Sequence, residues 1–232
     1  MDGILLVDKP QGWTSFDVVA KVRSLLRASG VNKPKVGHAG TLDPLATGLL
    51  VLLVGSATKR AAELSKLDKI YEVHMKLGET STTGDEEGQK TIVSDIKPTI
   101  KEVNQALLKF TGEIMQTPPV YSAIKVNGQR AYKLARQGKM VKLEARPVTI
   151  YKSDLISYEY PIVEFHSHVS SGTYIRSLAS DIGKELDTGA YMTGLRRTQI
   201  GQFNITDAMT IGQLTPVIIS QIIISFKQLK LA

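Results

Sequence analysis

The residues best suited to chemistry lie in one short stretch, GHAGTLDPLATGLL, at positions 37–50. It holds one carboxylate, Asp43, and one imidazole, His38, among glycines that permit tight turns. Pro44 restricts Asp43 to extended dihedrals, and the apolar run that follows offers a rigid footing. This pattern fits a catalytic carboxylate held in a fixed direction. It also fits an ordinary Asp-Pro turn without a chemical role.

Several other chemistries lack their residues. The chain has no cysteine, which excludes disulfides, thiol nucleophiles and cysteine-ligated metals. Neither a phosphate-binding G-x-x-x-x-G-K-[ST] loop nor a dinucleotide G-x-G-x-x-G motif is present. His166 and His168 share one face of an expected strand without an acidic cluster, so they are read as packing or solvent-facing side chains. We therefore expect no metal and no cofactor, and an enzyme that works with side chains alone.

Charge is concentrated in one segment of the 232 residues. Residues 125–152 contain one acid, Glu144, and these basic residues: Lys125, Arg130, Lys133, Arg136, Lys139, Lys142, Arg146 and Lys152. Their balance equals the net charge of the whole chain, +7. Such a local density suits a polyanion such as nucleic acid, although a solvated basic face is the alternative.

The elements that must position these residues follow from periodicity and capping signals. Helices are expected at 14–30, 57–66, 99–110, 174–186 and, near the end, 214–229, with a short one at 129–139. Strands are expected at 3–7, 49–55, 69–78, 120–126, 146–158, 161–169 and 195–203. Segments 31–48 and 78–90 are expected to be loops, the second polar and acidic. This mixed order, without regular βαβ alternation, predicts an α+β fold with a mixed sheet.

No targeting or membrane-spanning segment is visible in the sequence. The apolar run near the N-terminus, Ile4 to Val7, is far shorter than a signal-peptide core. We expect a soluble, cytoplasmic protein.

The motifs resemble a known family when they are taken together. The stretch 37–50 closely resembles the catalytic motif of the TruB-type tRNA pseudouridine synthases. The other matching motifs follow in order along nearly the whole chain: LLVDKPQGWTSFDVV (5–19), KIYEVHMKLGETSTTGDEEG (69–88), PPVYSAIKVNGQRAYKLAR (118–136), GTYIRSLASDIG (172–183) and LRR (195–197).

This resemblance implies a domain organisation. It implies a catalytic domain at 1–213 with a mixed, largely antiparallel central sheet flanked by helices. An inserted basic segment at about 119–152 would grip RNA. The remaining tail, 214–232, is expected to be helical and to fall short of the PUA-type RNA-binding domain that relatives carry.

Three residues receive catalytic roles from the resemblance. Asp43 would attack the ribose C1′ or stabilise it ionically. Arg176 would pair with Asp43 and keep it ionised and oriented, and Tyr71 would stack on the flipped uracil and serve as a base in the final deprotonation. From the residues alone, Tyr71 also reads as an ordinary strand tyrosine and Arg176 as a surface arginine.

Other residues receive binding roles. Tyr174 and Leu195 would line the pocket, or serve only as core residues. His38 would fill the gap left by extruded bases, and Lys9 would support the loop or contact RNA. The residues expected to grip RNA in the inserted segment are Lys125, Arg130, Lys133 and Arg136.

The function implied is isomerisation of uridine 55 in the T loop of tRNA to pseudouridine, with tRNA as partner, no obligate protein partner and a monomeric state. A second hypothesis is a module that grips or folds tRNA and whose main role is not catalytic. A third, modification of ribosomal RNA, is weaker because the motif details differ.

Overall fold

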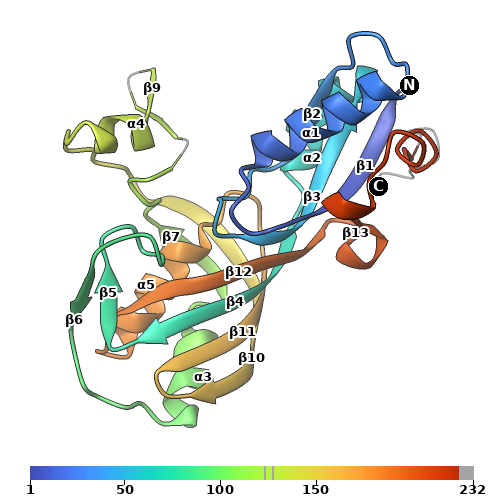
Figure 1. Ribbon diagram of the computed structural model, residues 1–232. Helices are drawn as coiled ribbons and strands as arrows, with labels where there is room; N and C mark the ends of the chain where they lie inside the picture. The colour runs from blue at the N-terminus through green and yellow to red at the C-terminus, as the bar shows by residue number, and fades with distance from the viewer. Residues whose placement is uncertain (123, 127, 225–232) are drawn as a thin grey trace. The chain divides into compact units, whose positions relative to one another are not determined.

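The computed structural model describes residues 1–122, 124–126 and 128–224 (Figure 1). The chain divides into two compact units: unit 1 comprises Met1–Tyr71 with Leu195–Ala232, and unit 2 comprises Glu72–Gly194. It passes from one unit to the other within strands β4 (Lys69–Leu77) and β12 (Ala190–Ile200).

Unit 1 is built on strands β1 and β3. Its remaining elements include two short strands, a long helix and a short one, and 3-10 turns. In chain order they are β1 (Gly3–Lys9), α1 (Ser15–Ala28), β2 (Val36–His38), β3 (Thr47–Val54), η1 (Gly55–Arg60), α2 (Ala61–Ser65), β13 (Phe203–Asn204), η2 (Ile205–Asp207), β14 (Met209–Thr210) and η3 (Ile211–Gln213).

Strands β1 and β3 pair antiparallel from Gly3↔Val54 to Lys9↔Gly48 and are covered on both faces. On one face lie α1 and the segment with Leu214 and Ile219; on the other lie η1 and α2. Burial on both faces explains why β3 reads as an unbroken apolar run in the sequence. The strand expected at 49–55 is thereby confirmed.

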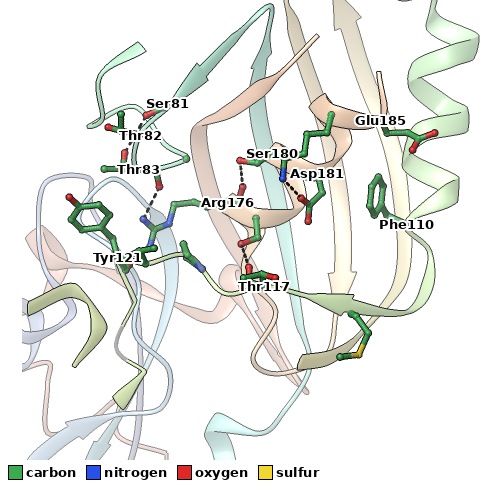
Figure 2. Close-up of a pocket in the computed structure, with 16 residues that line it drawn as sticks. Ser81, Thr82, Thr83, Phe110, Thr117, Tyr121, Arg176, Ser180, Asp181 and Glu185 are labelled. Atoms are coloured by element: carbon green, nitrogen blue, oxygen red, sulfur yellow. Dashed lines mark hydrogen bonds and ion pairs between the residues drawn. The ribbon is translucent and has the colours of Figure 1, made fainter. Parts of the chain in front are cut away.

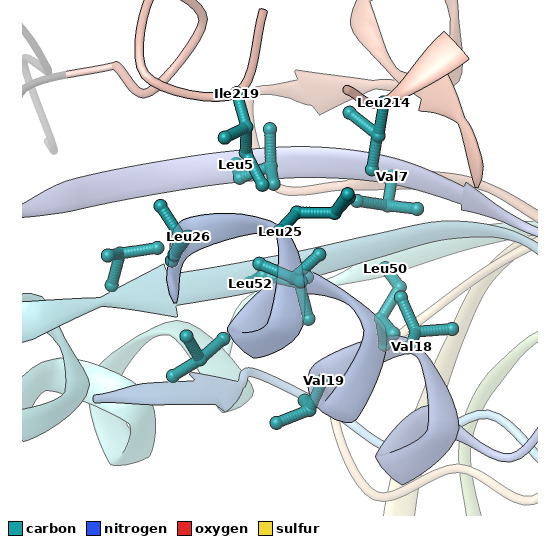
Figure 3. Close-up of a cluster of buried hydrophobic side chains, with 13 residues drawn as sticks. Leu5, Val7, Val18, Val19, Leu25, Leu26, Leu50, Leu52, Leu214 and Ile219 are labelled. Atoms are coloured by element: carbon teal, nitrogen blue, oxygen red, sulfur yellow. The ribbon is translucent and has the colours of Figure 1, made fainter. Parts of the chain in front are cut away.

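Helix α1 follows its sequence signals. Thr14 is the N-cap, and it exchanges hydrogen bonds with Asp17 in a capping box. Its apolar residues at helical spacing form a buried stripe toward β1 and β3 (Figure 3), namely Val18, Val19, Val22, Leu25 and Leu26. Gly30, at φ +94°, follows the helix end.

Unit 2 contains a hairpin-rich sheet covered by two helices. Its elements are β5 (Glu79–Ser81), β6 (Lys90–Ile92), α3 (Ile100–Lys109), β7 (Gly112–Gln116), β8 (Lys125–Val126), β9 (Gln129–Arg130), α4 (Ala131–Arg136), β10 (Arg146–Glu159), β11 (Ile162–Val169) and α5 (Ile175–Glu185). Helix α3 begins with the expected Thr99–Glu102 capping box and packs against β10 and α5.

Among the described residues, ten strands form one mixed sheet, with the order β14-β1-β3-β12-β4-β11-β10-β7 and with β13 and β2 as side pairs. Parallel pairings include β1 with β14 and β12 with β3. Antiparallel pairs predominate, as in β1–β3, β10–β11 and β10–β7. The expected α+β class with a mixed, largely antiparallel sheet flanked by helices is confirmed.

Several expectations for individual segments differ from the structure. The expected loop 31–48 contains β2, and the expected loop 78–90 contains β5 and the start of β6. Residue 123 of the strand expected at 120–126 lies outside the described residues, and among the others only Lys125–Val126 is a strand; β7 forms earlier, at Gly112–Gln116. The edge of the sheet is therefore taken by a segment whose alternation is too short to identify from sequence.

In the described part of the tail expected to be helical, residues 214–224, hydrogen-bonded turns form in place of a continuous helix. Ile224 pairs with Ile4 in an isolated β-bridge. Leu214 and Ile219 are buried in the cluster with α1 and β1, so the apolar rhythm of this segment reflects packing rather than a helix. The rest of this tail, 225–232, lies outside the described residues. In the part of the chain that is described, no helix is both long and apolar enough to cross a membrane.

Gly48 offers a test of how tightly unit 1 is packed. Its φ is +100°, and a Cβ there would lie 2.3 Å from the backbone oxygen of Arg197, whereas Gly30 has a similar φ, +94°, and nothing within 4 Å. We expect Gly30→Ala to lower the free energy of unfolding by about 1–2 kcal/mol through backbone strain alone. Gly48→Ala should cost about 3 kcal/mol or more because β3 and β12 must also separate. Urea unfolding followed by Trp13 fluorescence measures both, and equal losses would contradict this packing.

Candidate functional site

The loop at 39–46 connects β2 to β3 and presents Asp43. Ala39 donates its N–H to Val51 O at 2.9 Å, which extends the β2–β3 pairing. Leu42 and Ala46 are buried, while Asp43 between them is exposed. The Ala46 N–H donates to Asp43 O at 3.1 Å and closes a tight turn. The backbone is thus anchored on both sides of an accessible carboxylate.

The segment that leads from β1 into α1, residues 10–15, is hydrogen-bonded to this loop. Ser15, the first residue of α1, is buried; its Oγ accepts from Leu42 N at 2.8 Å and donates to Leu42 O at 3.1 Å. Gly12 donates its N–H to Pro44 O at 2.8 Å. The residues immediately before and after Asp43 are therefore both hydrogen-bonded to one neighbouring segment.

Two buried cations also bind backbone carbonyl groups around this loop. Arg197, 1% exposed, donates from Nε to Leu49 O at 2.8 Å and from Nη2 to Gly40 O at 3.1 Å. Lys9, 0% exposed, donates from Nζ to Pro10 O at 3.0 Å and to Trp13 O at 2.7 Å. Lys9 thus supports the segment that in turn holds the loop, and both of its expected roles stay predictions.

Burial lowers the pKa of Lys9 to about 8. The negative charge of Asp43 opposes this shift by raising the pKa, and the positive charge of Arg197 adds to it. Lys9 and Asp43 therefore belong to one electrostatic neighbourhood.

His38 ends β2, just before the loop, and is half-buried. Its Nδ1 is buried and has no hydrogen-bond partner within the described part of the chain. Burial lowers the pKa of His38, and the charge of Arg197 lowers it further. The imidazole is therefore neutral at physiological pH.

Tyr71 and Leu195 lie at the ends of unit 1 where β4 and β12 leave it. Tyr71 is 8% exposed, in a strand whose residues alternate between buried and half-buried. Leu195 is half-buried. These positions are compatible with the roles expected for both residues, which stay predictions.

In unit 2, the first turn of α5 carries Arg176, whose side chain is 9% exposed. Its Nη1 lies 3.0 Å from Asp85 Oδ2 and donates to Thr83 O at 3.3 Å. Its Nη2 donates to Tyr121 O at 2.8 Å. The guanidinium thus joins α5 to two separate segments, and its expected pairing with Asp43 stays a prediction.

Asp85 was not singled out in the sequence, where it reads as part of an acidic solvent loop. It is 5% exposed, and its Oδ1 accepts hydrogen bonds from Thr83 Oγ1 and, at 3.1 Å, from Glu87 N. A buried ion pair with its remaining oxygen also bonded fixes the orientation of Arg176. The role of Asp85 becomes apparent only in the structure, where its carboxylate pairs with the buried Arg176.

Next to Arg176 lies a cavity of about 710 Å³ (Figure 2). Its walls come from α5, from the 81–84 turn and from the 115–121 segment. Many lining hydroxyls are already bonded within the protein: Ser180 Oγ donates to Arg176 O, and Ser177 Oγ to Thr117 O. Tyr174, the N-cap residue of α5, is held at its backbone by both side-chain amide atoms of Gln116.

The basic segment forms the small β8–β9 hairpin and helix α4, with residues 123 and 127 outside the described part. The eight basic side chains counted from the sequence are all exposed. Helix α4 confirms the short helix expected here and places Lys133 and Arg136 on it. Backbone bonds from Ala131 and Tyr132 to Ile124 and Ser122 tie it to the preceding segment.

The structure therefore brings together two sets of expected residues. Asp43, Lys9 and His38 cluster in unit 1, with Ser15 and Arg197 as unexpected partners. Arg197 was visible in the LRR motif but carried no signal of burial. In unit 2, Arg176 and Tyr174 lie on the same first turn of α5.

The Lys9 environment gives a pH prediction. An unfolded lysine titrates near 10.5 and folded Lys9 near 8, so between these values the unfolded chain holds a proton that the folded chain has lost. Lys9 therefore makes the free energy of unfolding rise with pH across this window. Urea unfolding at pH 7.5 and 9.5 should show that Lys9→Met loses part of this rise. The same pH dependence in both proteins would contradict the desolvated lysine.

Two family models match the chain consecutively. The N-terminal domain model of the TruB family of pseudouridylate synthases matches residues 26–175, and the C-terminal domain model of tRNA pseudouridylate synthase B matches residues 176–221. Curated relatives named tRNA pseudouridine synthase B are 46% identical in Clostridium kluyveri and 47% identical in Pseudomonas aeruginosa. Each match covers 92% of this chain, and 72% and 69% of the respective relatives.

Solved structures agree with this relationship. A chain in the crystal structure of a Cbf5-Nop10-Gar1 complex superposes with a TM-score of 0.71 at 31% identity over 91% of this chain. A chain of an H/ACA RNP bound to a substrate RNA containing 2′-deoxyuridine gives 0.67 at 29% identity. This chain spans about half the length of those solved chains, 53% and 52%. The protein belongs to the TruB family of pseudouridylate synthases.

Proposed function

We propose that this chain isomerises uridine 55 in the T loop of tRNA to pseudouridine, with Asp43 as the catalytic carboxylate. As a TruB-family member it is an isomerase, and its curated relatives are named for pseudouridine synthesis in tRNA. The observation that carries the proposal is the exposure of Asp43 on a loop whose flanking residues, Leu42 and Pro44, are both hydrogen-bonded in place.

The reaction matches a lone carboxylate. The bond from C1′ to N1 of uracil breaks, the uracil turns in place, and C1′ bonds to C5, whose hydrogen leaves as a proton while N1 takes up a proton. No group is added or lost in total, so no redox partner is required. The electron-poor C1′ is the difficult species, and Asp43 either attacks it or stabilises it ionically, as carboxylates do at the anomeric carbon in glycosidases.

The remaining roles belong to the same proposal. Tyr71 stacks on the uracil and takes the final proton, and Arg176 orients Asp43. Arg176 is suited to this because Asp85 and two carbonyl oxygens already fix its guanidinium. A preset guanidinium loses little side-chain entropy when it binds a carboxylate. The neutral imidazole of His38 fills the space that extruded bases leave.

The basic segment supplies binding energy for base extrusion. A base in a folded loop must leave its stack before chemistry, at a cost of a few kcal/mol. The exposed cations of this segment, including Lys133 and Arg136 on α4, are available to phosphates. A solved relative is bound to a substrate RNA, which supports RNA as the ligand.

Asp43→Asn separates catalysis from binding. Tritium release from tRNA labelled at uracil C5 should be rapid with the natural chain and undetectable with the variant, because an amide cannot support C1′ in either role. Affinity for tRNA should change little, since the binding cations are untouched. A tRNA with cytidine at position 55 should release nothing. Equal release by both proteins would exclude Asp43 as the catalytic group, and loss of tRNA binding alone would favour a structural role.

Two adjacent hydroxyl residues provide a matched pair for testing the loop. Ser15→Ala removes both bonds to Leu42 and should lower kcat on the order of 10-fold, because small displacements of a catalytic group are costly. Thr14→Ala removes only the helix cap and should cost about 1 kcal/mol of stability with kcat nearly unchanged. Single-turnover rates at saturating tRNA measure the difference. If both variants lowered the rate alike, the Ser15 bonds would not position Asp43.

A further inference from the structure

An exposed aromatic ring lies on one edge of helix α1 together with basic residues. Phe16 is 62% exposed, an unusual state for so large an apolar side chain. Arg23 and Arg27 follow it at spacings of seven and four residues, which places all three on one edge of the helix. The opposite edge is the buried stripe toward β1 and β3.

Arg23 holds the ring from one side. Its guanidinium carbon lies 5.7 Å from the centre of the Phe16 ring, within the range of a cation–π contact. Its Nη2 also donates to Val36 O at 2.6 Å, at the start of β2. The guanidinium is therefore fixed between α1 and β2, and most of the ring surface stays open to solvent.

This ring is next to the loop that carries Asp43. Phe16 follows Ser15, whose hydroxyl exchanges two hydrogen bonds with Leu42. Phe16 adjoins Ser15 in the chain, and Asp43 adjoins Leu42. Because consecutive Cα atoms are about 3.8 Å apart, the exposed ring and the exposed carboxylate are each one residue away from the Ser15–Leu42 contact. Both side chains belong to unit 1.

The surroundings of the ring are basic. From Phe16 to Lys35 the sequence has one acid, Asp17, and it is engaged in the Thr14 capping box. The cations of this stretch are Lys21, Arg23, Arg27, Lys33 and Lys35. Within the described residues, no ion pair involves Arg23, Arg27 or Lys35. Arg27 and Lys35 are exposed, and exposed cations beside an open ring are complementary to a nucleotide.

We propose that Phe16 is a stacking platform for an unpaired base of the RNA substrate, and that Arg27 and Lys35 bind the phosphates beside that base. Bases in RNA loops are commonly recognised by stacking on aromatic side chains, with cations along the backbone. The contact rests on the proposed function, since the RNA is the one that places its uridine at Asp43. By fixing a second nucleotide beside the loop, Phe16 sets the register of the RNA.

The test compares variants of the full chain for binding to an RNA hairpin with the sequence of a tRNA T arm. Phe16→Ala and Phe16→Leu should weaken binding on the order of 10-fold, whereas Phe16→Tyr and Phe16→Trp should bind within about twofold of the natural chain. Leu108→Ala, at a similarly exposed position on α3 (66%), should bind normally. Thermal unfolding should be unchanged in all of them because both side chains are exposed.

Salt dependence separates the ring from the cations. Arg27→Gln with Lys35→Gln should reduce the slope of log affinity against log salt by about 1.5, and Phe16→Ala should leave that slope unchanged. The stacking contact would be overturned if Phe16→Leu bound the RNA as tightly as the natural chain does. It would also be overturned if Leu108→Ala lost as much RNA affinity as Phe16→Ala. Tritium release by the natural chain distinguishes the two failures. Release together with normal binding by Phe16→Ala refutes only this contact, and absence of release refutes the proposed function.

Discussion

The immobility of the backbone around Asp43 is the constraint on which the candidate site depends. Leu42 is bonded by the Ser15 hydroxyl and Pro44 by the Gly12 amide, so neighbours on both sides of the carboxylate are held by one segment. That segment is itself closed by Lys9 through two carbonyl oxygens. An aspartate on a free loop would sample many directions, and effective catalysis at a single carbon needs one. Hydrogen bonds to the backbone on both sides of Asp43 limit the directions that its side chain can take.

Burying two cations close to the Asp43 loop costs free energy of desolvation. Lys9 and Arg197 are both buried, and both donate hydrogen bonds to backbone carbonyl oxygens. Carbonyl dipoles stabilise a buried cation less than a carboxylate does, which is why burial dominates the lowered pKa of Lys9. The attraction of Asp43 works against that shift. The loop position, the buried cations and the Asp43 carboxylate are thus energetically linked.

The sequence predicted the elements with strong periodicity and clear caps, such as α1, α3, β3 and β4. It also predicted Asp43 as a candidate, because Pro44 and the glycines limit its backbone. Ser15 and Asp85 were missed for a physical reason. Their roles depend on hydrogen bonds to residues 27 and 91 positions away, and no local pattern encodes such partners. The helix predicted in the tail near Ile219 is wrong for the described residues, because the apolar rhythm there reflects packing on the α1 and β1 cluster.

Burial separates the basic residues into two groups that the sequence does not distinguish. Arg197 and Arg176 lie inside their units, and their guanidinium groups hold the backbone of other segments through carbonyl oxygens. Lys133 and Arg136 are exposed on α4, and within the described part of the chain neither donates a side-chain hydrogen bond to a backbone carbonyl. A net charge counts both groups alike. Only the exposed group can release counterions on binding a polyanion. It follows that binding to a polyanion draws on the exposed cations, whereas Arg176 and Arg197 hold backbone segments in place.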